Sequence, residues 1–185
     1  MSFDFSNKEH KKVLDFLKKV AVNAGKEINR NGILRPRPNE VGNDIEKYVM
    51  EELKNLKLKP EIPEGKNGNK KTTGYPDIIF FYKEKPYYLE CKTYNVKNLS
   101  TTQRSFYLSP SYEFKVTEDA VHFILSYEIY VSGEKKGNHI YKCNRYKILS
   151  IESLSLDVKY EFNSDNNRMY SGEDGAKILA DEEIK

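Results

Sequence analysis

Apolar residues recur at helical spacing near the start of the chain. Residues 6–29 open with Ser6 and Glu9, a serine followed three residues later by glutamate, which is a capping-box signature of a helix start. The apolar positions behind it fall on one helical face, which comprises Val13, Leu17, Val20, Ala21, Ala24 and Ile28. A first helix is therefore predicted over residues 6–29.

A second helix is predicted to begin just after residue 38. Pro36 and Pro38 disfavour a helix before them and permit one to start directly behind them. Beyond them a second apolar stripe has the helical period and is expected to be buried; it comprises Val41, Ile45, Tyr48, Val49, Leu53 and Leu56.

The middle of the chain has the pattern of strands. Residues 78–82 and 87–92 are dense in β-branched and aromatic side chains, and Lys83–Pro86 between them reads as a short hairpin connection. Residues 120–130 are apolar at both even and odd positions, which is typical of a central strand covered on two faces. Residues 133–138 are expected to form a loop that leads into a strand over 139–149.

Two remaining segments complete the expected order of elements. Residues 101–109 are predicted to form a short helix, and residues 163–175, which are rich in Asn, Asp, Ser and Gly, are predicted to form a long loop. Helices followed by strands, a helix and more strands indicate an α/β or α+β fold, in which a central mixed sheet is flanked by helices.

The length and composition fit a single domain. We expect a helix at 6–29, a catalytic core at about 39–150 and an acidic C-terminal extension at 161–185. No run of apolar residues is long enough for a membrane span, and the charged N-terminal helix does not resemble a signal peptide. The two cysteines, Cys91 and Cys143, are expected to be buried free thiols, which suits a cytoplasmic protein.

Candidate chemistry gathers on the predicted hairpin. Pro76-Asp77 precedes its first strand, and Glu90-Cys91-Lys92 ends the second. Since side chains alternate along a strand, Glu90 and Lys92 share one face while Cys91 points into the core. Asp77 would lie beside Glu90 on the antiparallel neighbour. Two carboxylates and one ammonium group form a site for a hard divalent cation and a water molecule.

This arrangement resembles the PD-(D/E)xK nuclease superfamily, with Pro76-Asp77 as the first half of its signature and Glu90-Cys91-Lys92 as the second. The resemblance implies a restriction-endonuclease-like core in which Asp77, Glu90 and the Cys91 carbonyl bind Mg²⁺, for which Mn²⁺ can substitute. It also implies that Lys92 orients or helps to deprotonate the attacking water. The alternative is a hairpin with a surface salt bridge between Glu90 and Lys92. Charges inside an apolar strand are costly, which disfavours that alternative.

The second predicted helix offers a further acid. Glu46 lies at the edge of the apolar stripe and, with Gly42 four residues earlier, is similar to the first-helix element of superfamily nucleases, whose acid assists the metal site. Glu40 and Asp44 are competitors, and Glu40 could instead interact with the helix N-terminus. A solvent-facing Glu46 in an i,i+4 ion pair also stays open.

Charge is unevenly distributed along the chain. The net charge is +3, but residues 161–185 hold seven acids and three bases, so the first 160 residues carry +7. A basic body suits a polyanionic ligand. Side chains near the predicted site that could contact phosphates or bases are Arg35, Arg37, Lys70, Lys71, Asn95, Lys97, Thr102, Gln103 and Arg104.

The small size and single catalytic unit resemble a type II restriction endonuclease. This implies Mg²⁺-dependent hydrolysis of double-stranded DNA to 5′-phosphate and 3′-hydroxyl ends. One site per chain and two strands to cut imply a homodimer. A Holliday-junction resolvase shares the motif but reads branched DNA. A catalytically silent DNA-binding module is a third hypothesis, disfavoured by the complete set of two acids and lysine.

Overall fold

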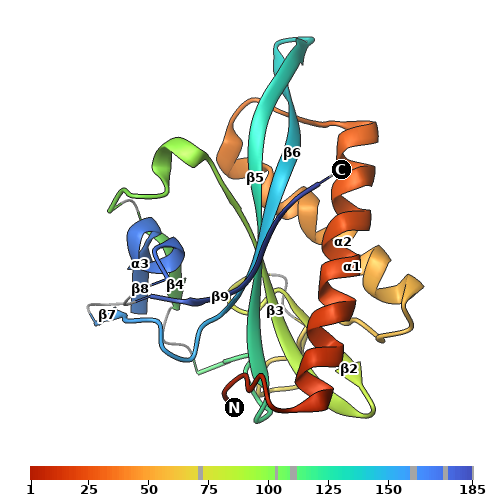
Figure 1. Ribbon diagram of the computed structural model, residues 1–185, viewed down its shortest axis with the longest axis vertical. Coiled ribbons are helices and arrows are strands. Elements are labelled where there is room, and N and C mark those ends of the chain that lie inside the picture. Colours follow the sequence, from red (N-terminus) through yellow and green to blue (C-terminus); the bar gives the residue numbers. More distant parts are fainter. Residues whose placement is uncertain (71–72, 103, 109–111, 159–161, 173–174, 185) are drawn as a thin grey trace.

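A mixed sheet forms the centre of the molecule. The computed structural model describes residues 1–70, 73–102, 104–108, 112–158, 162–172 and 175–184 (Figure 1). The strand order is β1-β6-β5-β3-β2, and β9 also pairs with β6. β3 and β5 are parallel, whereas the other neighbours are antiparallel. The strands are β1 (Ile33–Arg35), β2 (Ile78–Tyr82), β3 (Lys85–Tyr94), β5 (Val121–Lys135), β6 (Asn138–Ser150) and β9 (Lys177–Glu183). The predicted α+β class with a central mixed sheet is confirmed.

Two long helices cover one face of this sheet, to its right in Figure 1. They are α1 (Lys8–Asn31) and α2 (Gly42–Asn55), and a 3₁₀ turn, η1 (Pro38–Glu40), precedes α2. The stripes expected from the sequence are buried: Val13, Leu17 and Ile28 on α1, and Ile45, Val49 and Leu53 on α2, for example, have no exposed surface. None of the helices in the described part of the chain is both long and apolar enough to span a membrane.

A smaller module covers part of the opposite face. It contains the three-stranded sheet β4-β8-β7 and the short helix α3, to the left in Figure 1. Its elements are β4 (Arg104–Leu108), β7 (Asp157–Val158), β8 (Phe162–Asp165) and α3 (Asn166–Tyr170), and the turn η2 (Val96–Asn98) follows β3. Phe106, Met169 and Tyr170 form a second apolar cluster with Tyr94 and Ile124 of the main sheet. The module therefore packs beside the C-terminal half of β3.

Several local expectations are corrected. The helix expected at 101–109 is wrong, because residues 104–108 form β4 and pair with β8, more than fifty residues later. The loop expected at 163–175 contains most of β8 and all of α3. The first helix starts at Lys8 rather than residue 6, since the Asn7 side chain caps it by accepting hydrogen bonds from the Glu9 and His10 amides.

The C-terminal residues belong to the sheet. Residues 177–183 form β9, which pairs with β6 along Arg145–Ser150. One acid of this segment is paired within the sheet: Asp181 accepts hydrogen bonds from Arg145 and Lys147 of β6. The last part of the acidic C-terminal segment is thus a strand of the main sheet.

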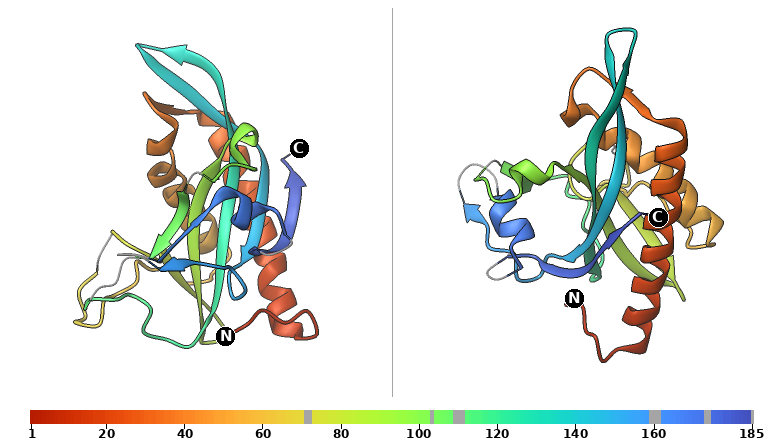
Figure 2. Two further views of the ribbon diagram at one scale, coloured as in Figure 1. Left: turned by 90° about the vertical axis from the view of Figure 1, so that its left-hand side faces the viewer. Right: turned by 45° about the horizontal axis from the view of Figure 1, so that its top comes forward.

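The hairpin of β5 and β6 is longer than expected. The strands run to Lys135 and from Asn138, so only Lys136 and Gly137 form the turn, whereas a loop over 133–138 was expected. Both turn residues have positive φ, 52° and 76°, as a two-residue hairpin turn requires. The end of this hairpin extends beyond the rest of the sheet (Figure 2).

Candidate active site

The register of the β2–β3 hairpin brings the motif together. Ile78 pairs with Leu89, so regular pairing on this edge of β3 stops one residue before Glu90. Asp77, directly before β2, therefore faces the backbone of β3, and its Oδ2 accepts a hydrogen bond from the Cys91 amide at 2.8 Å. The expected proximity of Asp77 to the Glu90–Lys92 segment is confirmed by this contact.

Glu90 and Lys92 are neighbours on one face of β3. The Lys92 Nζ donates to Glu90 Oε1 at 2.6 Å. Glu90 is only 6% exposed and the Lys92 side chain 26%, so this is not a surface ion pair of the kind considered as an alternative. Cys91 between them is buried in the helix-covered core, as predicted, and both cysteines are buried free thiols.

The second oxygen of Glu90 supports a role as a metal ligand. Glu90 Oε2 is buried and has no hydrogen-bond partner among the residues that the structure describes. A buried carboxylate oxygen without a partner is costly, and a cation would satisfy it. Among the described residues, no group of three or more His, Cys, Asp or Glu side chains is placed to hold a metal ion. Asp77 and Glu90 are thus a two-carboxylate set, which suits Mg²⁺, an ion often held by one or two carboxylates together with substrate phosphates.

Glu46 approaches the same site from α2. Burial raises the pKa of Glu46 to about 7, and the charges of Asp77 and Glu90 add to the shift. The two competing acids have other partners: Asp44 forms two hydrogen bonds with Arg35, at 2.6 and 2.9 Å, and Glu40 accepts one from Arg37 at 3.0 Å. The structure therefore favours Glu46 over Glu40 and Asp44.

The three acids share one electrostatic environment. Burial raises the pKa of Glu90 to about 7; Lys92 opposes this shift and Asp77 adds to it. Burial likewise raises the pKa of Asp77, against the effect of its hydrogen bond from the Cys91 amide. Carboxyl groups that raise one another's pKa in a low-dielectric site are stabilised in their ionised form when a cation binds between them.

The predicted DNA-contacting residues are dispersed around this site. Arg35 and Arg37 are held by Asp44 and Glu40, and Lys70 lies 3.3 Å from Glu61. These three candidate contact residues are thus each paired with an acid in the fold. Asn95 accepts a hydrogen bond from the Lys97 amide and caps the turn η2 directly after β3. Thr102 is exposed; Lys71, Gln103 and the Arg104 side chain lie outside the described part.

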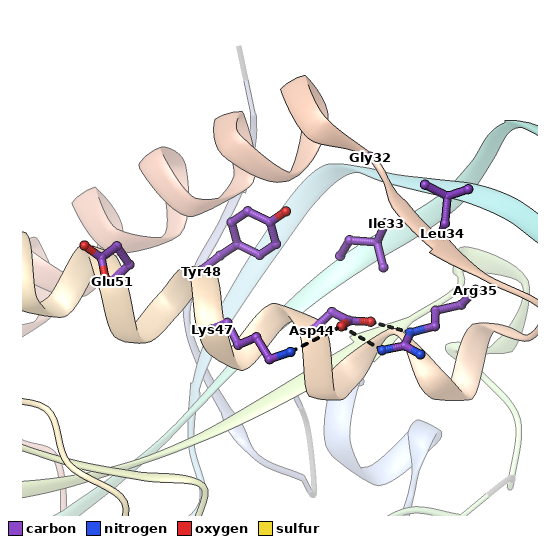
Figure 3. Close-up of a pocket in the computed structure, with 8 residues that line it drawn as sticks. All are labelled: Gly32, Ile33, Leu34, Arg35, Asp44, Lys47, Tyr48 and Glu51. Atoms are coloured by element: carbon purple, nitrogen blue, oxygen red, sulfur yellow. Dashed lines mark hydrogen bonds and ion pairs between the residues drawn. The ribbon is translucent and has the colours of Figure 1, made fainter. Parts of the chain in front are cut away.

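A surface cavity of about 520 Å³ lies between β1 and α2 (Figure 3). The α2 residues that line it, Asp44, Lys47, Tyr48 and Glu51, share one face of the helix. Glu46 projects from another face, because each residue turns an α-helix by about 100°. The cavity is therefore separate from the carboxylate site, although it contains the Arg35–Asp44 pair.

Two sets of contacts near the site, made by Lys115 and by Tyr75, were not predicted from the sequence. Lys115 is 3% exposed, and its Nζ donates to the Gly74 carbonyl at 2.6 Å. Tyr75 lies 2.5 Å, hydroxyl to ring nitrogen, from His122 Nδ1, and its ring contacts Phe106 of β4 edge-on. Both groups contact the turn that leads into Asp77. Nothing in the local sequence indicates these long-range contacts.

Comparisons of the sequence with known proteins identify one family. Residues 1–173 match the family described as type II restriction enzyme MjaV. The type II restriction enzyme MjaV of Methanocaldococcus jannaschii is 37% identical over 183 residues, which is 90% of this chain and 77% of the relative. A solved structure of the tetrameric restriction endonuclease SfiI bound to cognate DNA is similar at a TM-score of 0.45 and 11% identity, covering 82% of this chain and 69% of that chain.

Proposed function

The chain belongs to the type II restriction enzyme MjaV family, and from this premise we propose that it cleaves double-stranded DNA at a specific sequence in a reaction that depends on Mg²⁺. Family membership makes it a site-specific deoxyribonuclease. Beyond family membership, we propose the metal ion, the residues that carry the reaction and the products of cleavage. The observation that carries it is the convergence of Asp77, Glu90 and Lys92 on the unpaired edge of β3.

Each residue has a role that follows from its position. Asp77 and Glu90, with the Cys91 carbonyl, would hold the ion, and Glu46 would support them from α2. A bound Mg²⁺ supplies charge stabilisation for the phosphate and lowers the pKa of a water molecule. Lys92, partly exposed beside Glu90, is placed to orient that water and to stabilise the phosphate oxygen that gains charge. The products would be 5′-phosphate and 3′-hydroxyl ends.

We propose that the smaller module contacts the DNA. Tyr170 of α3 is hydrogen bonded to Ser126, which faces Lys92 across β3 and β5, so this module packs next to the catalytic lysine. Phe106 of β4 is buried and anchors this strand in the second apolar cluster. We propose that Thr102, Gln103 and Arg104 contact base edges. Arg35, Arg37, Lys70, Lys71, Asn95 and Lys97 remain candidates for contacts to the phosphates.

Digestion of defined DNA tests the reaction. With Mg²⁺, a plasmid of known sequence should give a fixed set of bands, whose ends ligate only when they carry 5′-phosphates. A smear would contradict sequence specificity. Preferred cutting of a synthetic four-way junction, with no fixed bands from the plasmid, would favour the resolvase alternative. We expect a homodimer, since two strands must be cut by chains with one site each.

Glu46→Gln is expected to slow cleavage by roughly tenfold, about 1.4 kcal/mol of barrier. The substitution preserves shape and removes the negative charge that supports Asp77 and Glu90. Single-turnover cleavage rates at saturating Mg²⁺ measure the effect, and thermal unfolding checks the fold. Glu40→Gln and Asp44→Asn, which alter ion pairs with Arg37 and Arg35, are matched controls from the same region. A tenfold loss in Glu40→Gln, with normal Glu46→Gln, would show that the wrong acid was chosen.

A further inference from the structure

Two surface loops pair with each other near the turn that leads into the proposed metal site. The Lys66 amide of the first loop donates to the Phe114 carbonyl of the second at 3.1 Å. The Asn67 side chain donates to the Glu113 carboxylate at 2.9 Å. These contacts join the loops into one element, which we call the loop tip and which comprises residues 64–70 and 112–115.

The loop tip is anchored to the chain that carries Asp77. Lys115 is buried, and its Nζ donates to the Gly74 carbonyl at 2.6 Å. Gly74 precedes Asp77 by three residues. In the left view of Figure 2 the loop tip projects at the lower left, on the same side of the molecule as α2, which carries Glu46. A duplex with a phosphate at the proposed metal site therefore passes close to the loop tip.

The loop tip presents two aromatic rings and a lysine to solvent. Tyr112 is 99% exposed and Phe114 is 46% exposed. The Lys66 ammonium group lies 5.6 Å from the centroid of the Phe114 ring, a cation–π contact. Because Tyr112 buries almost no surface, the stability of the fold does not explain a large aromatic ring at this position. Aromatic rings stack on nucleic-acid bases, and lysines contact phosphates, so this combination suits a nucleic-acid ligand.

We propose that the loop tip is a DNA-contact site separate from residues 102–104, in which Tyr112 packs against the duplex beside the cleaved phosphate and Lys66 contacts a neighbouring phosphate. The inference rests on the proposed function and deepens it. The positive charge of Lys66 complements the phosphates, and apolar side chains that enter a groove pack against base steps and sugars. Lys115 acts as the anchor that holds the tip beside the turn before Asp77.

Tyr112→Trp tests the contact directly, because the chain contains no tryptophan and the single indole then reports on the loop tip alone. The variant is titrated with a defined linear plasmid fragment, with Ca²⁺ in place of Mg²⁺. DNA should quench the indole fluorescence and protect it from acrylamide. Phe5→Trp is the matched control, since Phe5 is 44% exposed and lies just before α1, away from the loop tip. Its fluorescence should not respond to DNA.

Affinities for the same fragment measure what the contact contributes. Tyr112→Ala should bind roughly tenfold more weakly than the wild type, as expected for the loss of one aromatic stacking contact. Its melting temperature should not change, because the ring is exposed. Lys66→Gln should lower the slope of log affinity against log salt by about one, the effect of one lost phosphate contact. Lys26→Gln, on the exposed face of α1, is the control and should keep the wild-type slope.

The outcomes separate this site from the proposed reaction. An indole of Tyr112→Trp that does not respond to DNA, wild-type affinity in Tyr112→Ala, or an unchanged slope in Lys66→Gln would overturn the inference. Sedimentation without DNA tests whether a second copy of the chain covers the tip: a changed oligomeric state in Tyr112→Ala would assign the tip to a subunit interface instead. If the variants bind DNA weakly but the wild type does not cleave it with Mg²⁺, the proposed reaction fails and the contact site stands.

Discussion

Asp77→Asn is expected to reduce the rate of DNA cleavage by at least about a thousandfold, equivalent to about 4 kcal/mol of barrier. Asparagine keeps the shape and an oxygen that can accept the Cys91 amide hydrogen bond, so the turn before β2 should hold. The substitution removes the negative charge of a proposed metal ligand. Cleavage is measured under single-turnover conditions with Mg²⁺.

Binding of the same DNA in Ca²⁺ separates chemistry from recognition. Asp77→Asn should keep most of this affinity, because Asp77 makes no direct phosphate contact in the proposed site. Asp181→Asn is the matched control, since Asp181 is also a partly buried aspartate of the main sheet but pairs with Arg145 and Lys147. Wild-type cleavage by Asp77→Asn, or an equal loss in Asp181→Asn, would refute the proposed site.

Lys92→Gln is expected to lower cleavage by about a hundredfold or more, a typical effect of removing one donor that stabilises charge in a transition state. Its Nζ is hydrogen bonded to Glu90 and is the partly exposed group of the motif. Since Lys92 is not a metal ligand, the Mg²⁺ concentration for half-maximal cleavage should not rise. Single-turnover rates across a Mg²⁺ titration give both quantities.

Lys85→Gln is the control for this substitution. Lys85 lies at the start of the same strand and pairs with Glu9 of α1, far from the carboxylates. It should cleave at the wild-type rate. If Lys92→Gln requires much more Mg²⁺ and regains the wild-type rate at saturation, then Lys92 acts on metal binding and its proposed role in the chemical step is wrong.

The local pattern predicted the β2–β3 hairpin well. The spacing between Pro76-Asp77 and Glu90-Cys91-Lys92 determines which residues face each other in a two-strand unit, and short-range register needs no distant information. The two N-terminal helices were predictable for the same reason, because their apolar stripes have the helical period over several turns.

The helix expected at 101–109 was wrong, and the strand at 177–183 was not predicted, because the conformation of both segments depends on distant partners. β4 exists because β8 pairs with it, and β9 because β6 offers a free edge at Arg145–Ser150. Strand pairing over long sequence separations is decided by packing and not by local propensity. Asn7 likewise displaced Ser6 as the helix cap because its side chain reaches two amides, while Ser6 binds Asp4.

The sequence by itself determined the hairpin, the order of its chemical groups and the helix that carries Glu46, since these follow from periodicity and spacing along one stretch of chain. Only the tertiary structure shows that Asp44 and Glu40 form ion pairs with Arg35 and Arg37, and Glu46 is proposed as the supporting acid for this reason. Likewise, only the tertiary structure shows that Lys115 donates a hydrogen bond to the Gly74 carbonyl. Electrostatic interactions act through space, so the partners of a charged group leave no signal in the neighbouring sequence.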